Sequence, residues 1–318
     1  MKIVVLERES MGADIDISCF EDFGEMICYQ YTAPEEVAER TLDADIIIAN
    51  KTPLNENTLK EAKNLKLICE FATGYNNVDL EYCKKHDIHV TNAVGYSTPT
   101  VAQHTFAMLF YLLEKLPTYD RYVKSGAYTN SGNFTCFTPA FPDLAGKTWG
   151  IVGLGNIGRK VADIATAFGC KVIFYSASGN NTTTDYERVD FDTLLQESDI
   201  VSLHCPLTNL TENLFDEKAF SKMKKNAVLL NVARGPVVNQ EALYDALTTG
   251  KIAAAGLDVL TKEPMTKDNP LAKITDCEKL LITPHMAWGS NEARCRCTQE
   301  VYQNIQSFLQ GGNRNQIV

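Results

Sequence analysis

The segment "WGIVGLGNIGRKVADIATAFG", residues 149–169, constrains the fold more than any other part of the chain. An apolar run ends at Val152, three glycines follow, and a helical pattern begins. Gly153 allows a tight turn, Gly155 lets the backbone approach a pyrophosphate, and Gly158 permits close packing of helix on strand. The free N–H groups at the start of that helix would face the phosphates. Strand, turn and helix in this order favour a dinucleotide-binding fold over an ordinary αβ turn.

Short apolar runs alternate with helical patterns on both sides of this motif. Those before it are "KIVVLE", "ADIIIAN", "LKLICEFA" and "IHVTNA". Those from it onward are "KTWGIVGLG", "KVIFYS", "SDIVSLHCP", "NAVLLNVAR", "IAAAGLDVL" and "KLLITPH". Runs that are apolar on both faces are typical of strands buried in a parallel sheet. We therefore predict an α/β protein with two doubly wound parallel-sheet domains, the second with the six strands of a full dinucleotide-binding fold.

The connection between the two domains is predicted to be a buried helix. "TPTVAQHTFAMLFYLLEKLPTYD" is apolar almost all round, which is typical of a helix with no solvent face. The tail after His285 is too short for a domain of its own, so we expect it to return to the first domain. The predicted division is 1–99 plus 286–318 for the first domain and 100–285 for the dinucleotide-binding domain.

The composition fits two ordinary domains and excludes several classes of partner. The chain has 318 residues, 45% of them hydrophobic, and a formal net charge of −10, which repels nucleic acids and anionic membranes. No run of about 18 apolar residues predicts a membrane helix, and "MKIVVLERES" is typical of a strand rather than of a secretion signal. Ten scattered cysteines favour reduced thiols, so we expect a cytoplasmic protein, and the Cys295–Cys297 spacing does not predict a metal site.

The residue about twenty positions after the glycine motif bears on the choice of cofactor. A carboxylate for the adenosine ribose is usual there, but this chain has Ser176, in "FYSASGN". Serine neither repels a 2′-phosphate nor binds it as arginine does, and the first cation in the following loop is Arg188. Alternatively, Ser176 only ends the strand, and the backbone and Ser178 hold the ribose. We expect NAD as cofactor, with NADP as the alternative.

Three ionisable residues follow the last predicted strands, at the end of an open α/β sheet where ligands bind. They are Arg234, Glu263 and His285. A 2-keto acid needs a cation for its carboxylate and a proton donor for the alkoxide that forms when hydride arrives at C2. Arginine, and histidine beside a carboxylate, supply these groups, although each residue alone could be an ordinary surface charge. Asp258 either accepts a hydrogen bond from the nicotinamide carboxamide or caps the next turn.

Eight segments, in order, make the chain resemble a known family. They are "ATGYNNVDL", "TVAQHTFAMLF", "VGLGNIGRKVA", "LHCPLT", "NVARGPVVNQEAL", "AAGLDVLTKEP", "NPL" and "ITPHMAWGSNEAR". This pattern resembles the D-isomer-specific 2-hydroxyacid dehydrogenase family over nearly the whole chain. Through "NKTPL", "TGYNNVDL" and "PHMAW" it is most similar to the glycerate dehydrogenase or hydroxypyruvate reductase branch.

The resemblance implies a flavodoxin-like substrate domain, a Rossmann NAD-binding domain and the NAD(P)H-dependent reduction of a small 2-keto acid to its D-2-hydroxy acid, with the reverse oxidation. It implies that Arg234, Glu263 and His285 are catalytic, and that Thr73, Gly74 and Lys51 contact the substrate. The expected cofactor contacts are Gly153, Gly155, Asn156, Ile157, Gly158, Ser176, Cys205, Pro206, Thr211, Val232, Ala233, Asp258 and Thr100. The family usually has an acid where Ser176 stands.

The resemblance also implies a homodimer formed through the nucleotide-binding domains. The apolar helix from Thr100 to Leu116 and the aromatic "GAYTNSGNFTCFTPAF" offer surface for it, unless both belong to the core of one subunit. Two other functions stay open: an NAD(H)-binding corepressor-like module, which shares this fold, and a dehydrogenase for a larger 2-keto acid. Tyr75 and Trp288 could either narrow the substrate pocket or stack on an aromatic substrate.

Overall fold

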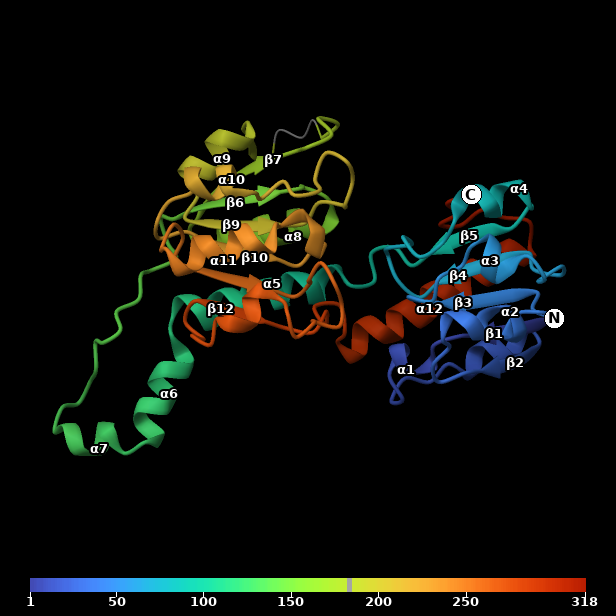
Figure 1. The fold of residues 1–318 in the computed structure, drawn as a ribbon, viewed down its shortest axis with the longest axis horizontal. Coiled ribbons are helices and arrows are strands. Elements are labelled where there is room, and N and C mark those ends of the chain that lie inside the picture. Colours follow the sequence, from blue (N-terminus) through green and yellow to red (C-terminus); the bar gives the residue numbers. More distant parts are fainter. Residues whose placement is uncertain (182–184) are drawn as a thin grey trace. The chain divides into compact units, whose positions relative to one another are not determined.

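The computed structural model describes residues 1–181 and 185–318, and the chain divides into two compact units (Figure 1). Unit 1 comprises Met1–Ser97 and Gly289–Val318, and unit 2 comprises Thr98–Trp288. The division expected from the sequence differs from these boundaries by two or three residues. Each unit has its own parallel sheet and its own buried core.

Unit 1 is built on a sheet of five parallel strands in the order β2-β1-β3-β4-β5, the flavodoxin-like order. The strands are β1 (Lys2–Val5), β2 (Glu25–Cys28), β3 (Ile46–Ala49), β4 (Leu67–Glu70) and β5 (His89–Asn92). The three central strands are almost completely buried, as their continuous apolar sequences require. The sequence reading missed β2, an edge strand that is only half-buried.

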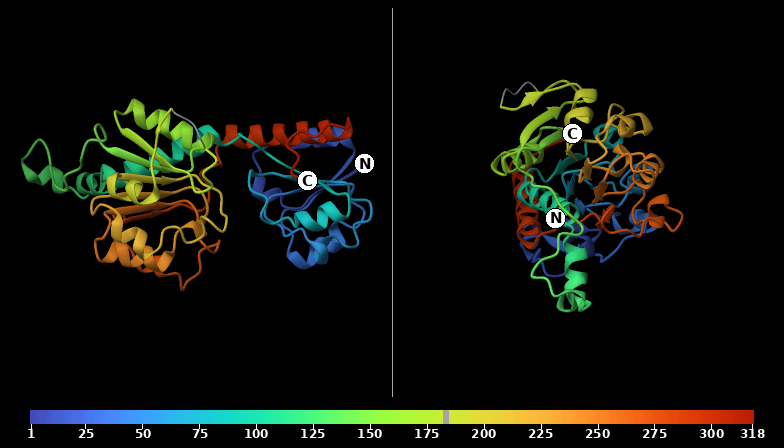
Figure 2. Two further views of the ribbon diagram at one scale, coloured as in Figure 1. Left: turned by 90° about the horizontal axis from the view of Figure 1, so that it is seen from above. Right: turned by 90° about the vertical axis from the view of Figure 1, so that its left-hand side faces the viewer.

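Helices cover the sheet of unit 1, and the last part of the chain completes it. The helices are α1 (Arg8–Met11), α2 (Val37–Arg40), α3 (Glu56–Leu59), α4 (Leu80–Lys85) and α12 (Asn291–Leu309), with 3₁₀ turns η1 (Ser18–Phe23) and η2 (Pro34–Glu36). Helix α12 packs on β4, and Figure 2 shows it lying along the unit. Val90 of β5 exchanges two backbone hydrogen bonds with Ile317 and Val318. Unit 1 therefore needs chain from both sides of unit 2.

Unit 2 is built on seven parallel strands in the order β12-β11-β10-β9-β6-β7-β8. The strands are β6 (Thr148–Val152), β7 (Lys171–Tyr175), β8 (Glu187–Arg188), β9 (Ile200–Leu203), β10 (Val228–Asn231), β11 (Ala254–Leu257) and β12 (Leu280–Ile282). This is the Rossmann order with one further strand, so the predicted fold class is confirmed. The six predicted strands are present, and the prediction missed the two-residue edge strand β8.

Both faces of the unit 2 sheet are covered by apolar clusters. Leu229 belongs to one cluster and its neighbour Leu230 to the other, because successive side chains of a strand point to opposite faces. The helices are α5 (Thr98–Leu113), α6 (Leu116–Lys124), α7 (Ala127–Ser131), α8 (Asn156–Ala167), α9 (Phe191–Glu197), α10 (Glu217–Lys222) and α11 (Gln240–Thr248), with 3₁₀ turns η3 (Gly235–Val237) and η4 (Pro270–Lys273).

The predicted apolar helix is two helices with different surroundings. Helix α5 packs on α8 and on β10, β11 and β12, and seven of its side chains are buried. Lys115 has φ +57°, which breaks the helix before α6 begins. Helices α6 and α7 project from the sheet of unit 2 (Figures 1 and 2), and the segment after them exposes Phe134 and Phe137. Much of α5 therefore belongs to the core of a single chain, which was one of the two alternatives for this helix. The projecting segment, in contrast, leaves aromatic side chains in contact with solvent.

No helix among residues 1–181 and 185–318 is long and apolar enough to cross a membrane. Within the same ranges, no group of three or more His, Cys, Asp or Glu side chains is arranged to hold a metal ion.

Candidate functional site

The glycine motif forms a turn between β6 and α8 that fits a pyrophosphate. Gly153 has φ +94°, and a Cβ there would lie 2.7 Å from the Cys205 nitrogen atom. A Cβ on Gly158 would lie 2.2 Å from the Gly153 carbonyl oxygen, so α8 packs closely on the turn. A Cβ on Gly155 would meet nothing within 4 Å, and no side chain caps the 12-residue helix that follows. The first N–H groups of α8, from Asn156 and Ile157 onward, are thus placed for the phosphates of a dinucleotide.

The loop after β7 is folded against this glycine turn. Ser176 is half-buried, and its carbonyl oxygen accepts a hydrogen bond from the Gly179 nitrogen at 3.1 Å. Asn181 Nδ2 donates to the Leu154 carbonyl oxygen at 2.6 Å. Arg188, on β8, donates from Nη1 to the Gly179 carbonyl oxygen at 3.2 Å. The threonines at positions 182–184, which the sequence reading counted among the hydroxyls of this loop, lie outside the described residues.

The loop after β9 contains three of the predicted cofactor residues and one histidine that the prediction left aside. Cys205 and Thr211 are almost completely buried, and the Thr211 hydroxyl donates to the Pro206 carbonyl oxygen at 2.7 Å. Thr211 therefore closes the turn that presents Pro206. Burial lowers the pKa of His204 to about 3, so its ring is neutral at pH 7.

The tautomer of His204 follows from its neighbour. The Ser202 hydroxyl oxygen accepts from Trp149 Nε1 at 2.8 Å, which directs the hydroxyl hydrogen to His204 Nε2, 3.0 Å away. The proton of the neutral ring is then on Nδ1, which is buried and has no partner among the described residues. His204 follows β9, and its backbone lies next to the Gly153 turn of the predicted phosphate site.

The three predicted catalytic residues follow three neighbouring strands, β10, β11 and β12. Arg234 lies just after β10, and its Nη1 donates to the adjacent Ala233 carbonyl oxygen at 2.7 Å. In the part of the chain that the structure describes, no carboxylate pairs with this guanidinium. A Cβ on Gly235 would lie 2.0 Å from the Leu260 carbonyl carbon, so the loops after β10 and β11 touch.

His285 and Glu263 form a charge-assisted pair. The His285 Nδ1 to Glu263 Oε2 distance is 2.7 Å, and Glu263 Oε1 accepts from the Leu260 nitrogen at 2.9 Å. His285 has φ +54°, uncommon for a residue with a Cβ, and its nitrogen donates to the Asp258 carbonyl oxygen at 2.8 Å. The ring is 23% exposed, and Nε2 has no partner within the described ranges. The carboxylate thus holds one ring nitrogen and leaves the other available for a further hydrogen bond.

Asp258 fixes the turn that carries His285. Its Oδ1 accepts from the Met286 nitrogen and the Thr283 hydroxyl, and its Oδ2 accepts from the Ala287 nitrogen, at 2.6–2.9 Å. The Asp258 side chain is 1% exposed. Of the two roles expected from the sequence, the turn-holding role is visible, and the contact with a carboxamide stays a prediction.

The predicted substrate residues of unit 1 lie at the carboxyl ends of β3 and β4. The Lys51 nitrogen donates to Glu7 Oε2 at 2.8 Å, which fixes the loop after β3. The Thr73 hydroxyl donates to the Ala93 carbonyl oxygen at 3.0 Å, and Thr73 itself is exposed. The neighbouring Gly74 is half-buried. These loops occupy the end of the sheet at which open α/β folds bind ligands.

Glu70, at the end of β4, is an unusual residue that the sequence reading did not single out. It is completely buried, and burial raises the pKa of its carboxyl group to about 8, so it is protonated at pH 7. Asn77 Nδ2 donates both to Glu70 Oε1 and to the Thr52 carbonyl oxygen, each at 3.0 Å. Glu70 Oε2 has no partner among the described residues. The neutral carboxyl group of Glu70 therefore holds the loops after β3 and β4 together through Asn77. The apolar pattern of β4 did not predict this role.

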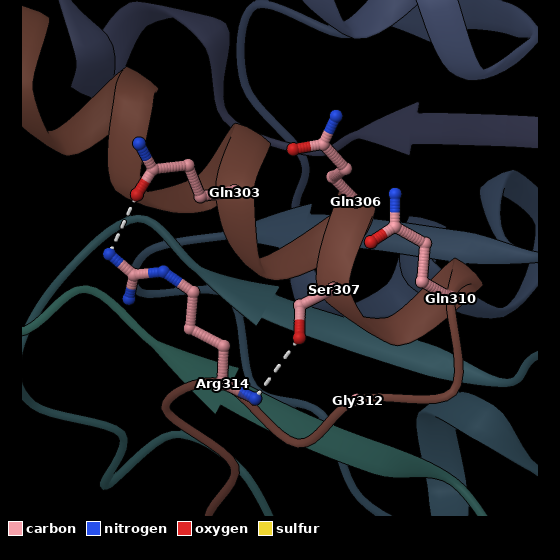
Figure 3. A pocket seen from close by; sticks show the side chains of 6 residues that line it. All are labelled: Gln303, Gln306, Ser307, Gln310, Gly312 and Arg314. Carbon is pink, nitrogen blue, oxygen red and sulfur yellow. Dashed lines mark hydrogen bonds between the residues drawn. The ribbon is translucent and has the colours of Figure 1, made fainter.

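A surface hollow of about 430 Å³ lies in unit 1 (Figure 3). It is lined by Gln303, Gln306, Ser307, Gln310, Gly312 and Arg314. The Arg314 guanidinium is already bound to Glu300 and Gln303. No predicted site residue lines this hollow, and its polar walls do not suit a nicotinamide cofactor.

The comparison with known proteins agrees with the geometry of unit 2. A sequence model described as "D-isomer specific 2-hydroxyacid dehydrogenase, NAD binding domain" matches residues 106–287. The chain belongs to this family. A hydroxypyruvate reductase of Blautia hydrogenotrophica is 37% identical over 321 residues, 99% of each chain. A glycerate dehydrogenase of Methylorubrum extorquens is 36% identical, over 99% of this chain and 98% of the relative.

Solved structures extend the likeness to the whole fold. An acyclic imino acid reductase in complex with NADPH and D-Arg matches with a TM-score of 0.89 and 32% identity, over 100% of both chains. Unit 2 is accordingly the NAD-binding domain of a D-2-hydroxyacid dehydrogenase family member.

Proposed function

We propose that this protein reduces a small 2-keto acid of the hydroxypyruvate or glyoxylate type to the D-2-hydroxy acid with NADH, and catalyses the reverse oxidation. The observation that carries the proposal is the 2.7 Å pair of His285 and Glu263. Glu263 follows β11 and His285 follows β12, and Arg234 follows β10 on the other side of β11, in an NAD-binding domain. Relatives named hydroxypyruvate reductase and glycerate dehydrogenase support the choice of a small substrate.

The geometry supports the following chemical roles. The nicotinamide cofactor, when bound, supplies the hydride that adds to C2. His285 donates the proton from Nε2 to the carbonyl oxygen, while Glu263 at Nδ1 stabilises the imidazolium and fixes the ring orientation. Arg234 binds the substrate carboxylate through two parallel N–H donors, because no carboxylate of the described chain occupies its guanidinium.

The remaining predicted contacts complete the proposal. In unit 1, Lys51, Thr73 and Gly74 offer groups to the substrate carboxylate from loops at the ligand-binding end of the sheet. In unit 2, the proposed cofactor contacts are Thr100, Gly153, Gly155, Asn156, Ile157, Gly158, Ser176, Cys205, Pro206, Thr211, Val232, Ala233 and Asp258. The open space at Gly155 and the uncapped start of α8 support the phosphate part of this set.

Steady-state kinetics of the purified chain test the proposal. We expect NADH oxidation with hydroxypyruvate or glyoxylate and much slower turnover with aromatic 2-keto acids. His285→Asn serves as the inactive control, because asparagine keeps a hydrogen-bonding side chain but does not transfer protons. A chain that binds NADH but oxidises it with none of these acids would support the binding-module alternative instead. A preference for aromatic acids would support the larger substrate.

The oligomeric state and location are also proposals. We infer a homodimer that covers the projecting segment of unit 2, since Phe134 is 91% exposed, Phe137 79% and Phe141 53% in the single chain. Light scattering should then give a mass of twice 35.3 kDa, and a mass near 35.3 kDa at micromolar concentration would reject the dimer. A cytoplasmic location is consistent with ten free cysteines.

A further inference from the structure

The edge strand β8 brings an arginine to the end of β7. β8 pairs with β7 in parallel, and the register places Arg188 opposite Phe174, two residues before Ser176. Ser176 stands where a carboxylate would normally bind the adenosine ribose and repel a 2′-phosphate. A cation distant in sequence therefore lies close to a position that has lost its usual negative charge.

Contacts of Arg188 fix its guanidinium against the turn that begins at Ser176. Nη1 donates to the Gly179 carbonyl oxygen at 3.2 Å and to the Asn181 carbonyl oxygen at 3.4 Å. A Cβ on Gly179 would lie 3.6 Å from Nη2, so the guanidinium lies over this glycine. The Gly179 nitrogen in turn donates to the Ser176 carbonyl oxygen. One turn thus connects the serine with the arginine.

The same loop is attached to the predicted phosphate site. Asn181 Nδ2 donates to the Leu154 carbonyl oxygen, between the first two glycines of the motif. The adenosine end of a dinucleotide whose pyrophosphate binds at this motif extends towards the end of β7. Ser176, Ser178 and the Arg188 guanidinium all lie in or against the loop at that end.

Arg188 has no carboxylate partner among the described residues, and most of its donors are unused within them. Neighbouring charges are paired elsewhere: Glu187 with Lys171 at 3.2 Å, and Asp185 with Arg159 at 2.9 Å. No carboxylate of the described residues pairs with Arg188, and its Nε and Nη2 donate to none of them. Backbone carbonyls orient the guanidinium without neutralising it, as an anion site requires.

We propose that Arg188, with the hydroxyls of Ser176 and Ser178, binds the 2′-phosphate of NADPH, so that this protein accepts NADPH beside NADH. The inference rests on the NAD-binding domain of the proposed function and not on the identity of the 2-keto acid. Arginine matches a phosphate with two parallel donors, and serine hydroxyls donate to the remaining oxygen atoms. No carboxylate at position 176 opposes the charge.

Calorimetric titration of the apoprotein with adenosine 2′,5′-bisphosphate and with 5′-AMP tests the site without any turnover. The two probes differ only in the 2′-phosphate. We expect the bisphosphate to bind at least about tenfold more tightly, the order of one charge-assisted phosphate contact. Salt should weaken the bisphosphate more than the monophosphate, because the added contact is ionic.

Substitutions identify which residue binds the 2′-phosphate. Arg188→Ala should abolish the tenfold difference between the probes and leave 5′-AMP affinity unchanged. Ser176→Asp should weaken the bisphosphate more than 5′-AMP through charge repulsion. Lys225→Ala is the matched control, because it removes an exposed cation that lies before β10 and has no ion-pair partner among the described residues, and it should preserve the difference. Each variant is also titrated with NADH to verify that the phosphate turn is intact.

The possible results separate this inference from the proposed function. If NADH binds and turns over but the two probes bind equally, the 2′-phosphate site is wrong and the reductase proposal stands. An unchanged difference in Arg188→Ala would likewise overturn the role of Arg188. If the bisphosphate binds more tightly through Arg188 but no 2-keto acid is reduced, the cofactor site holds and the substrate proposal fails.

Discussion

Glu70 makes the stability of unit 1 depend on pH in a direction opposite to that of most carboxyl groups. Its pKa is raised from the ordinary 4.5 to about 8, mainly by burial, with the Glu7 carboxylate adding to the effect and Asn77 and Lys51 opposing it. Between pH 4.5 and 8 the folded chain holds a proton that the unfolded chain has released. Stability is therefore highest below pH 4.5 as far as this group is concerned, and it falls as pH rises to 8.

The magnitude follows from this difference in pKa. About 3.5 pH units at 1.36 kcal/mol each give an upper bound of about 5 kcal/mol, of which about 3 kcal/mol is lost between pH 5.5 and 8.5. Glu70→Gln removes the titration and keeps an oxygen for Asn77 Nδ2. The side-chain NH2 group of the glutamine replaces Oε2 and has no acceptor among the described residues, so it lowers stability by the same amount at every pH. The free energy of unfolding of the variant should therefore no longer change with pH through position 70.

Hydrogen exchange followed by mass spectrometry measures this pH dependence of stability in the part of unit 1 around Glu70. Peptides that cover β4 and β5 are compared between parent and variant at the same pH, so the intrinsic exchange rate cancels. From pH 5.5 to 8.5 the ratio of parent to variant exchange rates should rise by about a hundredfold. Exposed Glu61→Gln is the control and should leave the ratio constant. A ratio for Glu70→Gln that changes less than about threefold would refute a protonated Glu70 in the folded chain.

Other substitutions test the catalytic residues and the dimer. His285→Ala should lower kcat by about 10² or more while NADH affinity by fluorescence stays unchanged; an unaltered kcat would remove it from the reaction. Arg234→Lys keeps the charge but loses the planar fork, so KM for the keto acid should rise and kcat fall, and a loss below about twofold in kcat/KM would argue against bidentate binding. Glu263→Gln should reduce kcat about tenfold or more by removing the counter-charge of the imidazolium, and a parent-like rate would show that the 2.7 Å contact is only structural. Changing both Phe134 and Phe137 to Ser should shift light scattering towards the monomer without loss of the NADH site; an unchanged mass would place the interface elsewhere.

The sequence predicted those elements whose cause is local. The glycine spacing predicted the turn at Gly153 and the close packing at Gly158, because steric demands of the backbone act over a few residues. The apolar runs predicted ten of the strands, since complete burial in a parallel sheet leaves an apolar pattern. The same reading missed β2 and β8, whose residues are partly or fully exposed and carry no such pattern.

Features that depend on distant pairing could not be predicted in this way. Arg188 is a dozen residues from Ser176 in sequence, and only the register of β8 on β7 brings it to the same turn. Glu70 looks like the polar end of an apolar strand until the loops around it are folded. Arg234, Glu263 and His285 each follow a predicted strand, and the observed order places these three strands side by side in the sheet. Their catalytic roles remain predictions for the experiments above.

The discontinuous composition of unit 1 has a consequence for synthesis on the ribosome. Unit 2 is continuous in sequence, whereas β5 of unit 1 receives its backbone partners from Ile317 and Val318, and β4 is covered by α12. Residues 1–97 therefore emerge first from the ribosome. They cannot complete their fold, and the edge of β5 stays unpaired, until unit 2 and the C-terminal segment have been translated. Unit 2 can fold during that interval, so nascent chains stalled after residue 288 should protect the dinucleotide-binding unit from protease before the N-terminal one.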